Sequence, residues 1–218
     1  MKLNRIFLGL TTIALLFAFA FTIPKKNVLI IGDSISIGYF PTVKKDLVNE
    51  AEVFHNPGNA QHTGTGLRML DKWLGDQKYD VIVFNWGLWD LCYRHPESTV
   101  QGRRDKLNGE ITYTVDVYEK NIEELVKRLK KTSAKLVFVT TTMIPPDEAG
   151  RFEGDEITYN DAAKAVMKKY DVEICDLHKH SIDIHKKYKL KDGDVHYTAE
   201  GYQKLAEPVI SAIKQALK

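Results

Sequence analysis

A serine hydroxyl at the junction between a strand and a helix is the first feature of the sequence that could do chemistry. Gly32, Asp33 and Ser34 directly follow the apolar run NVLII at 27–31, and a segment of helical period follows them. Backbone N–H groups at a helix N-terminus favour developing negative charge, so the amide of Ser34 can donate to the oxyanion of a tetrahedral intermediate. Ser34 therefore suits a nucleophile. The alternative is that Ser34 or Asp33 only caps the helix.

A serine is a poor nucleophile at neutral pH until a base removes its proton, which directs attention to the seven histidines. His196 is distinguished by its setting, because it ends the segment DGDVH at 192–196 and comes just before Thr198, the predicted N-cap of the last helix. This segment delivers a carboxylate and an imidazole together. Three other histidines lie among lysines and are interpreted as surface or core residues: His178, His180 and His185.

Two aspartates compete for the position beside His196. In an extended segment, residues two apart point to the same side, which favours Asp194 as the partner of the imidazole. A turn at Gly193 would present Asp192 instead. A dyad of Ser34 and His196 without either carboxylate is the third alternative.

Two segments carry a resemblance to a known family. GDSIS at 32–36 and DVHYTAEGY at 194–202 resemble the first and last motif blocks of the SGNH (GDSL-like) hydrolases. The resemblance covers essentially the whole chain after the first 24 residues. It implies a flavodoxin-like α/β/α fold and a Ser-His-Asp triad that acts on esters without a metal or an organic cofactor. Ser34 and His196 match the family pattern directly, whereas Gly193 stands where the family has its Asp.

The two inner blocks of the family, which supply further oxyanion donors, match this chain less closely. The second block begins with Asn and has a glycine five residues later, and the same count from Asn56 leads to Gln61. In the third block, G-x-N-D, Trp89 stands where the family has Asn. Asn85 provides the nearest side-chain amide and is our predicted substitute for this Asn. The equal alternative is that Asn85 is only a turn residue that closes a strand. Five residues are predicted to supply the oxyanion donors: Ser34, Gly58, Asn59, Gln61 and Asn85.

A parallel sheet is expected to position these residues, because strand-length apolar runs alternate with segments of helical period. The prediction is a flavodoxin-like three-layer α/β/α sandwich with a five-stranded parallel sheet, whose ligands lie beyond the carboxyl ends of the strands. Strands are predicted at 27–31, 52–55, 80–84, 135–140 and 172–176. Helices are predicted at about 36–48, 67–74, 114–131, 159–170 and 198–217, and a long loop at 86–111.

The composition indicates one globular domain. The chain has 218 residues, and its 31 basic and 29 acidic residues are interspersed, which argues against a nucleic-acid partner. Cys92 and Cys175 have neither the CxxC nor the Cys/His spacing of a zinc site, and we interpret them as structural residues.

The N-terminus has the pattern of a secretory signal peptide. Lys2 and Arg5 precede the uncharged run 6–21, which is shorter than the roughly 20 apolar residues of a spanning helix. We expect a signal peptide at 1–24, with cleavage near Ala20, and an SGNH hydrolase domain at 25–218. The mature protein would be periplasmic or secreted, without stable membrane insertion. An uncleaved membrane anchor is the alternative.

The expectations combine into an exported serine esterase that forms an acyl-enzyme on Ser34. Its substrate would be a small-molecule or carbohydrate ester, with acetyl groups on carbohydrate first and lysophospholipids second. Trp86 and Trp89 could stack on a sugar face, or they could cover the sheet edge. An acyltransferase would use the same site. The departures in the inner blocks favour a different alternative, a catalytically inactive carbohydrate-binding module on the same fold.

Overall fold

The computed structural model describes residues 24–218. Apart from Pro24, the predicted signal peptide and its cleavage site lie outside the described residues. None of the helices within the described part of the chain is long and apolar enough to cross a membrane.

The centre of the fold is a five-stranded sheet in the order β2-β1-β3-β6-β7, with every neighbouring pair parallel. The inner strands β1, β3 and β6 are almost wholly buried, because helices cover both faces of the sheet, and this burial explains their continuous apolar runs. The bounds of the strands are Lys26–Ile31 for β1, Ala51–His55 for β2, Val81–Phe84 for β3, Lys135–Val139 for β6 and Glu173–Cys175 for β7.

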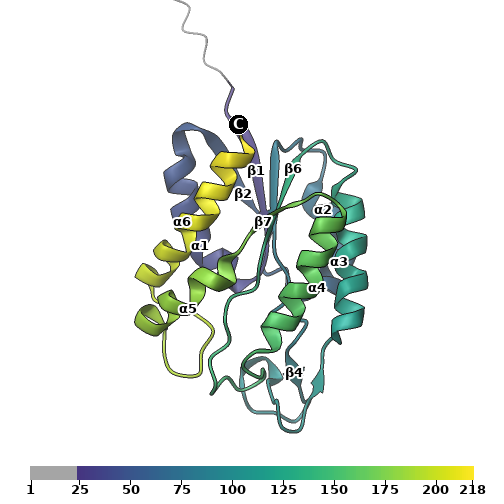
Figure 1. Ribbon diagram of the computed structural model, residues 1–218, viewed down its shortest axis with the longest axis vertical. Coiled ribbons are helices and arrows are strands. Elements are labelled where there is room, and N and C mark those ends of the chain that lie inside the picture. Colours follow the sequence, from purple (N-terminus) through teal and green to yellow (C-terminus); the bar gives the residue numbers. More distant parts are fainter. Residues whose placement is uncertain (1–23) are drawn as a thin grey trace, which may run out of the picture.

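Helices cover the two faces in two groups of three (Figure 1). The first group is α1 (Ser34–Asp46), α5 (Leu177–Tyr188) and α6 (Ala199–Ala216). The second group is α2 (Thr63–Leu74), α3 (Val115–Leu129) and α4 (Asp155–Lys169). The predicted three-layer α/β/α sandwich is therefore confirmed.

The buried face of α3 corresponds to the helical spacing of apolar residues in its sequence. Five side chains at three- and four-residue spacing face the sheet and α4, and each is fully buried. They are Tyr118, Ile122, Leu125, Val126 and Leu129. The cysteines Cys92 and Cys175 are also buried, and both are free.

The region 86–111, expected as a loop, contains a small hairpin of two strands. Strand β4 (Tyr93–Arg94) pairs with β5 (Glu110–Ile111) in antiparallel register, and the short 3-10 helix η2 (Gln101–Arg103) lies between them. A second 3-10 helix, η1 (Leu47–Asn49), follows α1. Figure 1 shows β4 beyond the carboxyl ends of the strands, at the edge where the sheet presents its loops.

Helix α5 was not predicted from the sequence. Its buried residues are Leu177, Ser181 and His185, spaced four apart on one face. Because two of the three are polar, the stripe that packs against the domain does not appear as an apolar period. Helix α2 also begins four residues before its predicted start, since Gly64 and Gly66 in its first turns weaken the helical signal.

Candidate active site

The turn between β1 and α1 leaves the hydroxyl of Ser34 outside the helix cap. Asp33 is the N-cap of α1, and its Oδ1 accepts the backbone N–H of Ile35 at 3.0 Å. Ser34 is the first residue of the helix, so the capping role belongs to its neighbour. The capping explanation offered by the sequence therefore applies to Asp33.

A continuous chain of hydrogen bonds joins Ser34, His196 and Asp194. The Ser34 Oγ lies 2.9 Å from His196 Nε2, and His196 Nδ1 lies 2.6 Å from Asp194 Oδ1. The same Oδ1 accepts the backbone N–H of His196 at 3.0 Å. In this arrangement Nδ1 carries the proton toward the carboxylate, and Nε2 is left to accept the serine proton.

The carboxylate beside the imidazole belongs to Asp194, and Asp192 points elsewhere. Burial tends to raise the pKa of Asp194, but the hydrogen bonds from the ring and the backbone of His196 outweigh it and hold the pKa below its ordinary value. Asp192 is exposed and pairs with Lys189 Nζ at 2.5 Å. A turn does occur at Gly193, where φ is +67°, but it leaves Asp192 in solvent.

A second histidine supports the loop that carries Asp194 and His196. His185, on α5, is buried, and its Nε2–H donates to the backbone carbonyl of Asp194 at 2.8 Å. The imidazole also packs edge-on against Tyr197. The sequence pattern had assigned His185 to the surface or the core, and its position one and two turns after Ser181 and Leu177 would have been the signal of a buried face.

Of the three backbone candidates in the loop after β2, only Asn59 lines the cavity that contains Ser34. The Asn59 Oδ1 accepts the backbone N–H of Gln61 at 2.8 Å, so this N–H of Gln61 is already engaged. Gly58 is exposed, and its carbonyl accepts from the side chain of Asn56 at 3.1 Å. The N–H of Gln61 is therefore corrected from a predicted oxyanion donor to a group that shapes the loop, and the role of Gly58 stays a prediction.

Asn85 and Trp86 also require correction. The side-chain amide of Asn85 is buried and donates to the carbonyl of Val139 at 2.7 Å, which ties the ends of β3 and β6 together. Trp86 is fully buried, and its indole N–H faces the carbonyl of Ala60 at 3.4 Å. Neither side chain reaches the cavity. Trp89 does line it, with the guanidinium of Arg94 over its ring, 4.5 Å from the ring centroid.

The cavity beside Ser34 has a volume of about 250 Å³. His196, Asp194 and Asn59 line it together with Ser34, so the hydrogen-bonded chain opens directly onto this space. Four basic side chains that the sequence pattern did not single out also line it: Arg94, Arg104, Arg151 and Lys191. Among residues 24–218, no three side chains of the His, Cys, Asp or Glu type gather as metal ligands.

Asp90 joins the loop after β3 to the start of α2. It is fully buried, and its carboxylate accepts the Thr63 hydroxyl at 2.5 Å and the Thr63 backbone N–H at 2.9 Å. Burial raises the pKa of Asp90 to about 7 despite these hydrogen bonds. The contact holds together the two loops that correspond to the inner motif blocks.

The sequence matches the model of a family described as GDSL-like lipase/acylhydrolase over residues 30–204. The chain belongs to this family. The hydrogen-bonded residues Ser34 and His196 both lie within the matched range. No curated protein matches the sequence significantly.

Several solved structures have the same fold as this chain. A lipase/acylhydrolase from Enterococcus faecalis aligns with a TM-score of 0.71 at 21% identity, covering 88% of this chain and 97% of that one. The acetyl xylan esterase AlAXEase aligns with a TM-score of 0.68 at 19% identity, over 86% and 99% of the two chains. An acetylxylan esterase from Geobacillus stearothermophilus aligns with a TM-score of 0.66 at 16% identity, over 86% and 94%.

Proposed function

We propose that this GDSL-like hydrolase is an exported serine esterase that cleaves carboxylic esters through an acyl-enzyme on Ser34. The observation that carries the proposal is the unbroken chain of hydrogen bonds from Ser34 through His196 to Asp194 at the wall of a cavity. A nucleophile, a base and a group that orients the base are the parts that acyl transfer requires.

In the proposed reaction the Ser34 Oγ attacks the ester carbonyl carbon while His196 Nε2 takes the hydroxyl proton. Asp194 keeps the proton on Nδ1 and stabilises the imidazolium. The tetrahedral intermediate collapses, His196 returns the proton to the departing alcohol, and the acyl group stays on Ser34. Water then attacks the acyl-enzyme with His196 again as base, and the acid leaves as Ser34 is restored.

The oxyanion is assigned to the backbone N–H of Ser34 and the side-chain Nδ2 of Asn59. The hydrogen bond from Gln61 to the Asn59 Oδ1 orients this amide, which leaves the Nδ2 side for the cavity. Hydrogen-bond donors that are already in place where the negative charge develops stabilise the transition state more than the bound ester. This difference lowers the barrier.

The proposed substrates are esters of short acyl groups, with acetyl groups on carbohydrate as the leading case. A cavity of about 250 Å³ lies below the usual range of about 300 to 1,000 Å³ for ligand pockets, which favours an acetyl group over a long lipid chain. Trp89 offers an aromatic surface beside it. Two neighbours of the same fold are acetylxylan esterases, which agrees with this choice.

The enzymatic part is tested by labelling with a fluorophosphonate and by hydrolysis of 4-nitrophenyl acetate. We expect the protein to be labelled and active, and the Ser34→Ala variant to be folded, unlabelled and inactive. Labelling or turnover that persists in Ser34→Ala contradicts the assignment. A folded wild-type protein that neither labels nor hydrolyses would instead be a binding module. Product analysis with an added sugar acceptor separates hydrolysis from acyl transfer.

Export is tested separately, because it rests on the residue pattern of 1–24. The full chain is expressed in a bacterium, and the protein recovered from the periplasm or medium is subjected to N-terminal sequencing. We expect a new N-terminus close to residue 21. Retention of the intact N-terminus in the membrane fraction would contradict the proposal and support an anchor.

A further inference from the structure

The cavity at Ser34 holds more positive charge than its carboxylates balance. Arg104 and Arg151 both contact the same oxygen of the buried Glu148, at 2.5 Å and 2.9 Å. The other oxygen of Glu148 accepts the backbone N–H of Gly150 at 2.7 Å. One carboxylate therefore serves two guanidinium groups, and both of its oxygens already accept hydrogen bonds.

Arg94 and Lys191, which we call the cavity cations, line the same space. Among the residues that the structure describes, neither has a carboxylate within 4.0 Å. The Arg94 guanidinium donates to the carbonyl of Gly102 and lies over the ring of Trp89. Burial lowers the pKa of Arg94, and the nearby Arg151 and Arg104 lower it further, while Cys92 and Glu148 act in the opposite direction.

The two carboxylates that line the cavity are occupied by other partners. Asp33 is buried and caps α1 through the N–H of Ile35, and Asp194 is bonded to the ring and backbone of His196. Neither residue forms an ion pair with Arg94 or Lys191 in the described part of the chain. The cavity cations are therefore available for an anion brought by a ligand.

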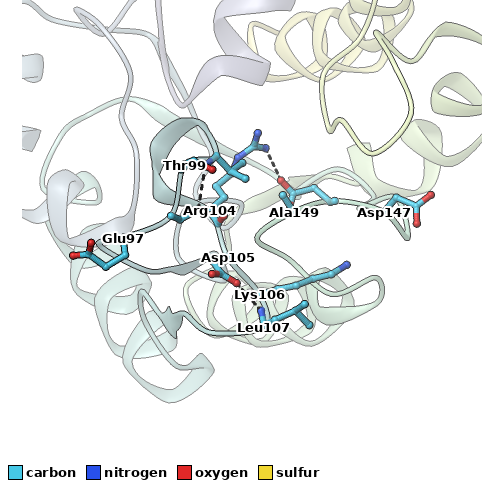
Figure 2. A pocket seen from close by; sticks show the side chains of 11 residues that line it. Glu97, Thr99, Arg104, Asp105, Lys106, Leu107, Asp147 and Ala149 are labelled. Carbon is cyan, nitrogen blue, oxygen red and sulfur yellow. Dashed lines mark hydrogen bonds and ion pairs between the residues drawn. The ribbon is translucent and has the colours of Figure 1, made fainter.

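A second hollow adjoins the cavity at Arg104, which lines both. Its volume is about 550 Å³, and Figure 2 shows its residues, among them Lys106, Leu107 and Asp147. This hollow provides room beyond the small catalytic cavity, so the alcohol portion of an ester can extend past Arg104 toward the β4–β5 hairpin.

We propose that the cavity cations bind a carboxylate or phosphate group carried by the substrate, so that the enzyme prefers an anionic ester over a neutral one. The inference rests on the proposed esterase function, because the anion belongs to the same molecule as the ester at Ser34. A guanidinium presents a planar fork of N–H donors that suits carboxylate and phosphate oxygens. In a half-buried site such a pair interacts more strongly than in water.

The test compares two acetyl esters of the same ring: 4-acetoxybenzoate, which is anionic, and its neutral methyl ester. The neutral compound has the better leaving group, so chemical reactivity alone does not favour the anion. We expect the wild type to have the higher kcat/KM for the anion. We expect Arg94→Met to lower the anionic-to-neutral ratio of kcat/KM at least about tenfold, as for the loss of one charge-assisted hydrogen bond.

Arg103→Met is the matched control, because Arg103 is exposed in the same hairpin and does not line the cavity. It removes the same charge, and the ratio should stay within about twofold of the wild type. Lys191→Met is the second variant, since Lys191 is exposed and its replacement does not disturb the core. We expect it to lower the ratio about threefold. Equal ratios in Arg94→Met and Arg103→Met would overturn the proposal.

A binding measurement separates this proposal from the esterase assignment. Calorimetric titration of the Ser34→Ala protein with benzoate, benzamide and inorganic phosphate requires no turnover. Binding of benzoate identifies a carboxylate ligand and binding of phosphate a phosphate ligand, and either binding should be lost in the Ser34→Ala, Arg94→Met double variant. Binding of neither anion, or of benzamide equally well, overturns the anion site. A wild type that binds the anion but hydrolyses no ester refutes only the esterase function.

Discussion

The imidazole of His185 holds the backbone of Asp194, the residue whose carboxylate holds the catalytic imidazole of the proposed triad. The Nε2–H of His185 donates to the Asp194 carbonyl at 2.8 Å, and the Asp194 Oδ1 lies 2.6 Å from His196 Nδ1. Two histidines thus lie on opposite sides of one aspartate. Only His196 lines the cavity, so His185 is a positioning residue that sets where the carboxylate lies.

Replacement of His185 by Phe should lower kcat about tenfold with little change in KM, because the Asp194 carbonyl loses a buried donor at a cost of about 1–3 kcal/mol. The loop then holds the carboxylate less well against His196, so the apparent pKa of the base in the pH profile of kcat/KM should fall. His185→Gln keeps a donor and should recover most of the activity. A variant pair with equal kcat and an unshifted pH profile would show that His185 only fills the core.

The two candidate acids can be separated by isosteric substitutions. Asp194→Asn removes the acceptor that fixes the tautomer of His196, and kcat should fall by up to about 10⁴-fold. Asp192→Asn breaks only an exposed pair with Lys189, so kcat should stay within about twofold. Steady-state kinetics on 4-nitrophenyl acetate measure both variants. A large loss in Asp192→Asn with a small one in Asp194→Asn would reverse the assignment.

The sequence predicted the inner strands well because helices cover both faces of the sheet. A strand buried on both sides carries a continuous apolar run, as in VIVF of β3, and such a run has clear ends. The same burial explains why the roles of Asn85 and Trp86 were wrong. Both follow β3 directly, and the sequence does not distinguish a side chain that faces the cavity from one that faces the core when both sides of the sheet are covered.

The proposed nucleophile and base were found because each lies beside a recognisable helix start, at Asp33 for Ser34 and at Thr198 for His196. The cavity cations had no comparable signal. Arg94 lies in a region without helical or strand period, and Lys191 lies among other lysines. Residues of the hairpin region and of the His196 loop line one cavity, and local sequence does not encode this tertiary arrangement.

Asn59 can be tested as an oxyanion donor by separating its two hydrogen-bonding roles. Asn59→Asp keeps an oxygen for the N–H of Gln61 but removes the Nδ2 donor, and Asn59→Ala removes both. Each should lower kcat and kcat/KM together by about 10²-fold or more, because the lost interaction exists only in the transition state. Asn85→Ala serves for comparison and should reduce thermal stability more than kcat. A normal kcat in Asn59→Asp would contradict the role.

Asp90 should make the protein less stable as the pH rises from about 4 to about 7. Its pKa is raised by burial to about 7 in the folded state, against about 3.9 in an unfolded chain, so the folded protein binds more protons between these values. The free energy of unfolding therefore falls with rising pH by up to ~1.4 kcal/mol per unit, and this contribution is constant above about pH 7.

Asp90→Asn separates this effect from that of carboxylates whose contribution to stability has the opposite pH dependence. Asp194 is one of them, because its lowered pKa adds stability that is lost on acidification. The Asn side chain keeps an oxygen for the hydroxyl and N–H of Thr63, so the link to α2 survives without a titrating group. Urea unfolding at about pH 5 and about pH 8 should show a smaller loss of stability in Asp90→Asn than in the wild type. The exposed Asp76→Asn should follow the wild type. Parallel pH dependences in wild type and Asp90→Asn would mean that Asp90 is ionised throughout, with its charge held by Thr63 and the N-terminus of α2.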